Sequence, residues 1–565
     1  MQKIWKILQP DSLKVNYLAT SLGISPFLAR LLINRKIDSP GEAYKFLNPS
    51  LSDLHNPFLF RDMGKTIERI KTAIARKENI LIYGDYDVDG ITGTALLVKL
   101  LKAYGGRVFY YIPHRIEEGY GISEEGINYA REKRINLVIT VDCGTTDASE
   151  VEILARKGID VIITDHHEPE EDNFPLYAFS IINPLSPGET YPDKNLSGVG
   201  VVFKLAQALL EDYSEFKQLM DLVCLGTIAD ASPLRGENRI LVKYGLNQLN
   251  ETKRPGIKAL MEVAEIESRK LSPYDVSFIL GPRINAMGRI DSAELSLRLF
   301  ITESLSEAQE IAKVLNITNR KRQEIEEEIY NEAISRIERE INFKDDFSIV
   351  LGDAKWHQGV IGIVASKLSQ RYSRPVILFS FKNKIASGSG RVNLEDIHLL
   401  KVLDRCKHLF ISYGGHKSAC GIKMEENLIP SFRTLFNQLL KETFSLEVFS
   451  PVLYINGELP FSAINSSLIN EFNQLAPFGE GNPWPVFATC GLRIKNILTN
   501  RNRNKLEVWV TDGSLTYQVR GRDFENWISQ TEEIKSFDLA YVPRLFNFQG
   551  EEYISLNIED FRITP

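Results

Sequence analysis

The sequence predicts an α/β protein: a parallel-sheet domain, joined by a long helix to a second α/β domain, with a small β-barrel at the C-terminal end. Three observations lead to this prediction. The 565 residues exceed what one compact core holds, so about three to four folding units are expected. Short apolar runs alternate with helical patterns from residue 78 onward, and strand-like runs dominate after about residue 450.

The alternation of strand and helix is clearest between residues 78 and 182. The strand-like runs are Ile80–Tyr83, Val108–Ile112, Leu137–Val141, Val161–Thr164 and Ile181–Ile182. Helical patterns, such as Ser123–Lys133 and Ala148–Lys157, separate most of them. Strands and helices that alternate in this way predict a parallel sheet covered on both faces.

The flanking segments have other patterns. Residues 1–45 are interpreted as short helices, with Ser39 as an N-cap and Pro40 as the first helical residue. Residues 198–300 are mainly helical by pattern. The highly charged segment 303–341 carries apolar residues at helical spacing, which predicts a long connecting helix whose charges face solvent.

A second α/β unit starts near Phe347, with strands expected at Ser348–Leu351 and Val376–Phe379. The runs Leu506–Val510 and Leu515–Val519 flank a turn at 511–514 and predict the β-barrel. The predicted divisions are 1–45 for an N-terminal helical segment, 46–300 for the first α/β domain, 301–342 for the connecting helix, 343–445 for the second α/β domain and 446–565 for the barrel.

Composition excludes several classes of protein. The net charge of −7 argues against a protein that coats DNA, although a carboxylate-lined metal centre would itself add negative charge. No apolar stretch approaches the roughly 20 residues that span a bilayer, and the polar N-terminus lacks a signal core, so a cytoplasmic location is expected. Five widely spaced cysteines without a C-x-x-C pair argue against a thiolate zinc site and a disulfide framework.

Three alternating acids, Asp85, Asp87 and Asp89, follow the first strand of the predicted sheet directly. Such a concentration of negative charge is commonly relieved by a divalent cation. An EF-hand loop is excluded, because its twelfth position requires a bidentate Glu and Leu96 stands there. A helix should also precede an EF-hand loop, whereas a strand is expected here.

Three further acidic sites end apolar runs: Asp142, the triplet Asp165-His166-His167, and Asp230. Any one of them alone fits a turn or a helix cap. In an open α/β sheet, however, the carboxyl ends of the strands meet at one crevice, so the Asp85–Asp89 segment, Asp142 and the Asp165-His166-His167 triplet are expected to lie together.

Oxygen ligands with one or two imidazoles suit Mn²⁺ or Mg²⁺ better than structural zinc. A pair of such ions could activate a water molecule and stabilise the attacking and leaving oxygens in phosphoryl transfer. No G-x-x-x-x-G-K-[ST] loop occurs in the sequence, so an ATP-driven motor is not supported.

Together these motifs resemble the DHH phosphoesterase superfamily and, within it, the bacterial RecJ exonucleases, which degrade single-stranded DNA from the 5′ end. The resemblance extends over about residues 45 to 565. It continues in the segments Gly281–Arg289, Trp356–Gly362, Ser387–Arg391 and Gly414–Gly421. The last segment differs mildly from the family pattern, because Cys420 stands where alanine is usual.

The resemblance implies the ligands of two ions, Mn²⁺ or Mg²⁺. Asp87 and Asp142 would hold one ion, and Asp89, Asp142, His166 and Asp230 the other, so that Asp142 bridges them. It also implies that Asp85 and His167 are weaker ligands or orienting groups near the metals. The three folded parts would be a DHH domain, a DHHA1-type domain and an OB-fold barrel.

Several groups could handle phosphate. Arg283 and Arg289 suit bidentate phosphate contact, with exposed arginines on a capped turn as the alternative. The composition of Ser387–Arg391 fits an anion-binding nest of backbone amides or a flexible surface turn. By the resemblance, Ser389, Arg391 and Arg115 form a pocket for a 5′-terminal phosphate. His357 and His416 are candidates for holding the scissile phosphate or protonating the leaving oxygen, or they are structural histidines.

In the barrel, aromatic residues and the basic run 501–505 suit contact with a single strand. For each aromatic side chain, core packing is the alternative. The aromatic residues are Trp484, Phe487, Trp509 and Tyr517.

We therefore expect a two-metal 5′→3′ exonuclease of single-stranded DNA that releases nucleoside 5′-monophosphates and acts in recombination and repair. The alternatives are another DHH phosphoesterase, acting on oligoribonucleotides, cyclic dinucleotides or pyrophosphate, and a non-catalytic scaffold of a replication complex. The resemblance implies a RecQ-type helicase and a single-strand-binding protein as partners. A monomer without membrane contact is expected.

Overall fold

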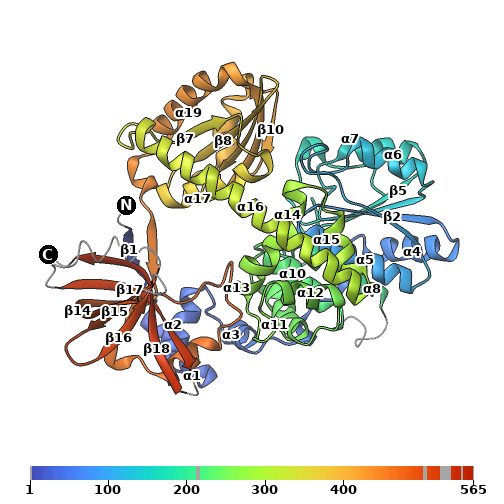
Figure 1. Cartoon of the computed structure of the whole chain (residues 1–565). Helices are drawn as coiled ribbons and strands as arrows, with labels where there is room; N and C mark the ends of the chain where they lie inside the picture. Colours follow the sequence, from blue (N-terminus) through green and yellow to red (C-terminus); the bar gives the residue numbers. More distant parts are fainter. Residues whose placement is uncertain (1–2, 211–216, 501–504, 522–535, 549–550, 564–565) are drawn as a thin grey trace. The chain divides into compact units, whose positions relative to one another are not determined.

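The computed structural model describes residues 3–210, 217–500, 505–521, 536–548 and 551–563. It forms two compact units (Figure 1). One unit comprises residues 50–445 and 479–481, and the other comprises residues 1–49, 446–478 and 482–565.

The first domain of the larger unit is built on a five-stranded sheet in the order β3-β2-β4-β5-β6, in which every pairing is parallel. Its strands are β2 (Asn79–Gly84), β3 (Arg107–Tyr111), β4 (Leu137–Val141), β5 (Asp160–Thr164) and β6 (Ser180–Ile182). All five lie where apolar runs predict strands, and the prediction of a parallel sheet is confirmed.

Helices cover both faces of this sheet. Ile80, Ile82 and Ile139 pack on one face with α4 (Met63–Ala75), α5 (Val88–Ala103) and α8 (Gly198–Leu209). The alternate side chains of the same strands pack on the other face with α6 (Glu124–Glu132) and α7 (Ala148–Arg156). Because both faces are buried, the strands are apolar throughout rather than alternating.

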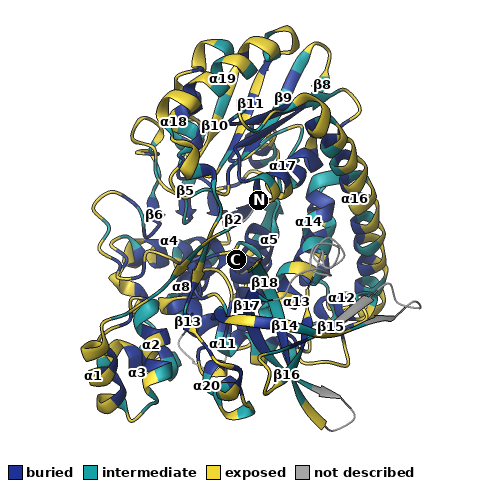
Figure 2. Ribbon diagram, turned by 90° about the vertical axis from the view of Figure 1, so that its left-hand side faces the viewer, coloured by how far each residue is buried: buried dark blue, intermediate teal, exposed yellow. Residues whose placement is uncertain are grey.

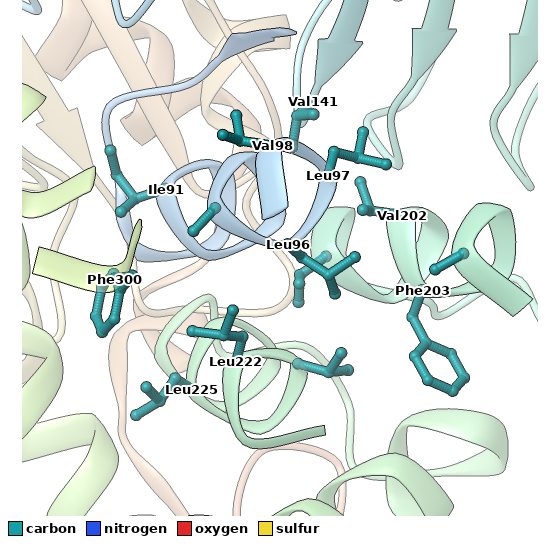
Figure 3. Packing of buried hydrophobic residues seen from close by; sticks show 14 of the residues in the cluster. Ile91, Leu96, Leu97, Val98, Val141, Val202, Phe203, Leu222, Leu225 and Phe300 are labelled. Carbon is teal, nitrogen blue, oxygen red and sulfur yellow. The ribbon is translucent and has the colours of Figure 1, made fainter. Parts of the chain in front are cut away.

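Helices after the sheet extend the first core. Side chains of α5, α8 and α10 (Met220–Ala229) face one another in this core (Figure 3). The further helices are α11 (Gly236–Asn250), α12 (Pro255–Val263), α13 (Pro273–Asp275), α14 (Gly281–Ile290) and α15 (Glu294–Ile301). The prediction that this region is mainly helical is confirmed.

Helix α16 (Leu305–Glu340) connects the two α/β domains of this unit (Figure 1). Exposed and buried residues alternate along it (Figure 2). Ala308, Ile311 and Leu315 belong to the first core, whereas Ile329 and Ile337 belong to the core of the second domain. The connecting helix predicted from spacing is therefore present and is part of both cores.

The second α/β domain has a mixed sheet in the order β10-β11-β9-β8-β7, in which only β7 and β8 pair in parallel. The strands are β7 (Ile349–Asp353), β8 (Val376–Lys382), β9 (Ile385–Arg391), β10 (Ser412–Gly415) and β11 (Ala419–Glu425). Its helices are α17 (Gln358–Tyr372), α18 (Leu399–Asp404) and α19 (Ile429–Thr443).

The smaller unit contains a β-barrel. Its strands are β13 (Gly457–Glu458), β14 (Phe487–Asn500), β15 (Lys505–Thr511), β16 (Thr516–Arg520), β17 (Phe537–Phe548) and β18 (Glu551–Ile563). They pair in the order β13-β14-β15-β16-β18-β17, and an additional pairing of β14 with β17 closes the sheet. This pairing closes the strands β14 to β18 into a barrel, with β13 added beside β14, and the predicted barrel is confirmed.

The N-terminal residues pack in the same unit as the barrel. Strand β1 (Ile4–Ile7) pairs in parallel with β12 (Val452–Ile455). Side chains of α1 (Ser12–Leu22), α2 (Pro26–Asn34) and α3 (Pro40–Leu47) share one core with the barrel and with α20 (Ser466–Asn473). As predicted, Ser39 caps α3 and Pro40 is its first residue. In the described part of the chain, no helix is long and apolar enough to cross a membrane.

Candidate metal centre and phosphate-binding groups

The predicted acidic sites lie where the strands of the parallel sheet end. Asp85 follows β2, Asp142 follows β4 and Asp165 follows β5. Asp87 is the N-cap of α5, and its Oδ1 accepts hydrogen bonds from the Asp89 and Gly90 amides at 2.9 and 3.2 Å. All these strands run in the same direction, so their ends meet at one edge of the sheet. Asp230 reaches the same place from the C-terminal end of α10.

These side chains form three overlapping groups whose ligand atoms lie within 4.8 Å of one another in each group. The groups are Asp142, His166 and His167; Asp89, His166 and Asp230; and Asp85, Asp87 and Asp142. Asp142 and His166 each occur in two groups. The structure thus brings together seven of the predicted site residues, and the groups are linked through Asp142 and His166.

Asp142 adopts an unusual backbone conformation, with a φ of +63°. This left-handed region is uncommon for residues other than glycine and is often found at functional sites. The amide of Asp142 still continues the sheet by donating to the Thr164 carbonyl at 2.9 Å. Only after this last sheet hydrogen bond does the chain turn sharply, and the carboxylate of Asp142 points into the cluster.

Burial and mutual repulsion weaken the acidity of the clustered carboxyl groups. Burial raises the pKa of Asp89 to about 7, and the charges of Asp230 and Asp87 add to the effect. Burial, followed by the charges of Asp89 and Asp87, also raises the pKa of Asp142 far above its ordinary value. So many buried carboxylates cannot all be ionised unless positive charge is supplied nearby.

The two histidines are held differently. Burial opposes the protonation of His166, but the negative charges of Asp230, Asp89 and Asp165 outweigh it and raise its pKa. His167 Nδ1 lies 2.7 Å from Asp165 Oδ1. Burial lowers the pKa of His167, whereas the charge and hydrogen bond of Asp165 raise it to about 9 overall.

The donor atoms fit a divalent cation. Asp85 Oδ1, Asp142 Oδ1 and His166 Nε2 are buried and have no hydrogen-bond partner among the described residues. His166 Nε2 lies only 3.2 Å from Asp142 Oδ1 and 3.9 Å from Asp89 Oδ2. Buried polar atoms normally find partners, and a bound ion would satisfy them. Carboxylate oxygens with imidazole nitrogen form a donor set that suits Mn²⁺ or Mg²⁺.

Asp165 orients this cluster rather than joining the three groups. Its Oδ1 accepts from the amides of His166 and His167, at 2.7 and 3.2 Å, and its Oδ2 accepts from the Thr145 amide at 3.0 Å. Burial raises its pKa, but the charge and the hydrogen bond of His167 lower it further, so the carboxyl group stays ionised.

Arginines lie beside the acidic cluster. Burial lowers the pKa of Arg289 to about 9, and the positive charges of Arg115 and Arg391 contribute. Arg115 stacks on the Tyr86 ring at 4.7 Å, and Arg391 donates to Ser389 Oγ at 3.1 Å. Among the described residues, no carboxylate forms an ion pair with any of the three arginines. Asp87 acts on Arg289 through its charge, and Arg115 acts on Asp85 and Asp87, but none of these carboxylates occupies the guanidinium N–H groups. Guanidinium groups left in this way are suited to binding an anion.

Two expectations for these phosphate-handling segments are wrong. Residues Ser387–Arg391 form neither a nest nor a flexible turn, because they belong to β9 and pair with β8 and β11 on both sides. Their backbone amides therefore belong to a paired strand, and only their side chains can meet a ligand. Residues Gly281–Arg289 are likewise helical, within α14, rather than a turn.

Arg283 is turned toward α16 instead of toward Arg289. Its Nε donates to Asn316 Oδ1 at 3.1 Å and its Nη1 to the Ile279 carbonyl at 2.7 Å. Its neighbouring charges are Arg320 and Glu265. It is therefore not grouped with Arg115 and Arg391.

The other two histidines predicted to belong to the site, His357 and His416, lie near these arginines. His357 is the N-cap of α17, and its Nδ1 accepts the Gly359 amide at 3.1 Å, which leaves Nε2 as the group that can donate. Arg289 Nη1 donates to the Gly359 carbonyl at 3.3 Å. His416 lies on the β10–β11 hairpin; burial lowers its pKa, as do the charges of His167 and Arg391.

Two residues of the site carry no sequence signal. The Tyr120 hydroxyl donates to the Asp142 carbonyl at 3.1 Å and lies 3.0 Å from His167 Nδ1. Asn183, at the end of β6, donates to Thr145 Oγ1 and to the His167 carbonyl, both at 2.9 Å. Both are single residues outside any motif, although the position of Asn183 at a strand end matches that of the acids.

The aromatic residues of the barrel are mostly packed. Phe487 is buried and stacks with Phe472, and Tyr517 packs edge-on against Phe461. Trp484 stacks on Phe478, and Arg544 covers its ring at 3.3 Å. Residues 501–504 of the basic run lie outside the described part of the chain.

Comparison with protein families matches three parts of the chain. Residues 79–227 match the DHH family N-terminal domain, residues 345–442 the DHHA1 domain, and residues 455–560 the RecJ OB domain. The matches correspond to the parallel-sheet domain, the second α/β domain and the barrel.

Several curated relatives carry the name single-stranded-DNA-specific exonuclease RecJ. The relative from Bacillus subtilis (strain 168) is 38% identical over 483 residues, which cover 85% of this chain and 61% of the relative. The relative from Escherichia coli (strain K12) is 32% identical over 559 residues, which cover 95% of this chain and 96% of the relative.

Solved structures agree with these relatives. RecJ from Thermus thermophilus in complex with Mn²⁺ has a TM-score of 0.83 and 28% identity, covering 100% of this chain and 80% of that chain. The same protein in complex with Mg²⁺ has a TM-score of 0.77 and 26% identity, covering 100% of this chain and 79% of that chain. With the Escherichia coli relative matched over nearly its full length, these likenesses show that the chain belongs to the RecJ family of single-stranded-DNA-specific exonucleases.

Proposed function

We propose that this protein is a metal-dependent 5′→3′ exonuclease that hydrolyses phosphodiesters of single-stranded DNA and releases nucleoside 5′-monophosphates. The observation that carries the proposal is the convergence of buried carboxylates and imidazoles, with unpartnered ligand atoms, beside arginines that form no ion pair with a carboxylate among the described residues. The match of residues 455–560 to the RecJ OB domain favours a polymeric substrate over a small dinucleotide or pyrophosphate.

Two divalent cations, Mn²⁺ or Mg²⁺, would be held by the clustered side chains. Asp87 and Asp142, with Asp85 nearby, would hold one ion, and Asp89, His166 and Asp230 would hold the other together with Asp142. When bound, such ions supply Lewis-acid stabilisation of the attacking and leaving oxygens.

The protein's own groups would orient the substrate. Asp165 would keep His167 charged and fixed in position, so that its remaining N–H can donate to a phosphate oxygen. His357, whose Nδ1 is used as a helix cap, would present Nε2–H as a donor. His416 would face the same phosphate from the β10–β11 hairpin.

Arg115, Ser389 and Arg391 would bind the terminal 5′-phosphate, with Arg289 beside them. A strand held by its terminal phosphate places one particular phosphodiester over the acidic cluster, which would account for 5′→3′ polarity. Arg283 would contact the backbone farther along the strand, from its position against α16.

We further propose that the protein acts in the cytoplasm as a monomer in DNA recombination and repair. Strands with free 5′ ends would be exposed by a RecQ-type helicase and handed over in the presence of a single-strand-binding protein.

The test is digestion of a 5′-phosphorylated single strand with added Mn²⁺. The wild-type protein should release mononucleotides from the 5′ end, and Asp142→Ala should lose nearly all hydrolysis while remaining folded. Asp396→Ala, which removes an exposed carboxylate of the second α/β domain, should retain normal turnover. Near-normal hydrolysis by Asp142→Ala would overturn the assignment of the site.

A further inference from the structure

The N-terminal end of α8 holds Asp89 by both carboxylate oxygens. The Gly198 amide donates to Oδ2 at 2.7 Å and the Val199 amide to Oδ1 at 2.9 Å. Ser197 caps the same helix and its hydroxyl lies 2.7 Å from Thr227 Oγ1 on α10. The partial positive charge at a helix N-terminus favours a carboxylate, so the first turn of α8 fixes the direction in which Asp89 points.

The same turn also lies against Asp142. A Cβ atom at Gly198 would lie 2.6 Å from Asp142 Oδ1 and 2.8 Å from both Cβ and Cγ of Asp142. Separations this short are essentially never tolerated between such atoms. The side chain of Asp142 cannot move away freely, because its left-handed backbone is fixed by the last hydrogen bonds of β4.

We propose that Gly198 is a positioning residue that seats Asp89 and Asp142 together, so that the carboxylate lone pairs not used by amide donors face a common cation. Its amide orients Asp89, and its missing side chain leaves the space that Asp142 occupies. The inference rests on the proposed function, because it concerns how the same carboxylates are held ready for divalent metal.

A second glycine supports the same arrangement from another helix. A Cβ atom at Gly226, on α10, would lie 2.8 Å from Asp89 Oδ1 and 2.4 Å from Thr92 Oγ1. Asp89 is therefore enclosed by two helices that approach closely because glycine stands at each contact. Such outer contacts orient metal ligands, and their loss typically weakens metal binding by about 10- to 100-fold.

Mn²⁺ binding by the metal-free protein, measured by isothermal titration calorimetry, tests the role of Gly198. We expect Gly198→Ala to raise the Kd for Mn²⁺ by at least about tenfold. The matched control is Gly200→Ala in the same helix, where a Cβ atom would meet Ser197, Leu196 and Asn238 at 3.1 to 3.6 Å and no carboxylate of the site. This control should change the Kd less than about twofold, even if it lowers the unfolding temperature.

A double-variant cycle on the metal-free protein keeps the test decisive if Gly198→Ala folds poorly. In an Asp142→Gly background the side chain that the added methyl group would strike is absent, and glycine suits the φ of +63°. Gly198→Ala should therefore lower the unfolding temperature in the wild-type background and leave it unchanged in the Asp142→Gly background. Equal shifts in both backgrounds would show that Gly198 is not coupled to Asp142 and would overturn the inference.

The outcomes also separate this inference from the proposed function. If wild-type protein binds Mn²⁺ and digests single strands, but Gly198→Ala binds Mn²⁺ equally well, only the inference fails. If the wild-type protein neither binds Mn²⁺ nor digests single strands, the proposed function itself fails.

Discussion

Asp147 shows how one buried side chain fixes a loop of the site. Its Oδ2 accepts the Ile122 amide at 2.8 Å, and a Cβ atom at Gly121 would lie 2.4 Å from its Oδ1. The loop that ends here carries Arg115 and Tyr120. Burial raises the pKa of Asp147 to about 7 from its ordinary value of 3.8, so this contact depends on pH.

The direction of that dependence follows from proton linkage. Between pH 4 and 7 the folded protein keeps a proton on Asp147 that the unfolded chain releases, so the free energy of unfolding falls as pH rises through this window. Asp147→Asn keeps an acceptor for the Ile122 amide but cannot ionise. From pH 5 to pH 7 the free energy of unfolding of the wild-type protein should fall by about 2 kcal/mol more than that of the variant. Urea unfolding at both pH values checks this, and parallel pH profiles would contradict it.

Arg391 permits a test of end recognition. A charge-assisted hydrogen bond to phosphate contributes roughly 1.5–3 kcal/mol, so Arg391→Ala should lower kcat/KM on 5′-phosphorylated strands by about 10- to 100-fold. The loss should be much smaller on strands that end in a 5′-hydroxyl.

The control for this test is Arg107→Ala, which removes an exposed arginine of β3. It should leave the ratio between the two kinds of end unchanged. An equal loss on phosphorylated and hydroxyl ends by Arg391→Ala would place the terminal phosphate elsewhere.

At the level of single residues, the sequence allows prediction of the acids because each ends an apolar run in a periodic pattern. Tyr120 is not predicted, since a single phenol in a loop has no pattern around it. Asn183 is not predicted either, because it follows its strand as a lone amide without a carboxylate or histidine beside it. The left-handed backbone of Asp142 and the close approach of Gly198 to Asp142 could not be predicted from the sequence either, because both depend on atoms brought together from distant parts of the chain.

Among the elements, α2 is held in the barrel unit by its apolar side chains in the shared core and by one buried arginine that follows the helix. Arg35 donates to Asn482 Oδ1 at 2.8 Å, to the Pro483 carbonyl at 2.6 Å and to the Leu31 carbonyl at 3.0 Å. Asn482 is fully buried. Loss of the guanidinium would leave several buried acceptors without donors.

Arg35→Ala should therefore lower the free energy of unfolding of the barrel unit by about 3 kcal/mol. Thermal unfolding followed by tryptophan fluorescence would measure it, since Trp5, Trp484 and Trp509 all belong to this unit. Arg30→Ala, at an exposed position of α2, should have little effect. If Arg35→Ala lowered the free energy of unfolding as little as Arg30→Ala does, α2 would be held by apolar packing alone.

Helices and strands with a clear hydrophobic period can be predicted from the sequence. Strands that form only because they pair with distant segments cannot. The glycine and serine residues of Ser387–Arg391 have the local composition of a turn, yet pairing with β8 and β11 makes the segment a central strand. Likewise, no local feature of Ile4–Ile7 indicates that it pairs with Val452–Ile455, more than four hundred residues away.

For the whole molecule, the free energy of ion binding should appear as stability. A ligand that binds only the folded state stabilises it by about 2.7 kcal/mol at a concentration of 100 times its Kd. Chelation of metal should therefore lower the unfolding temperature of the wild-type protein, and added Mn²⁺ should restore it. Asp142→Ala should respond far less. Equal responses of the two proteins would argue that the stabilising ion binds elsewhere.

Helix α16 has a consequence for how the larger unit comes apart. Its 36 residues form a rod about 54 Å long, with Ala308, Ile311 and Leu315 in one core and Ile329, Ala333 and Ile337 in the other. If either core unfolded, α16 would lose about half of its packing contacts. A helix without such contacts is only marginally stable in water. Residues 50–445 should therefore unfold on heating in one cooperative transition. Neither α/β domain should remain folded after the other has unfolded.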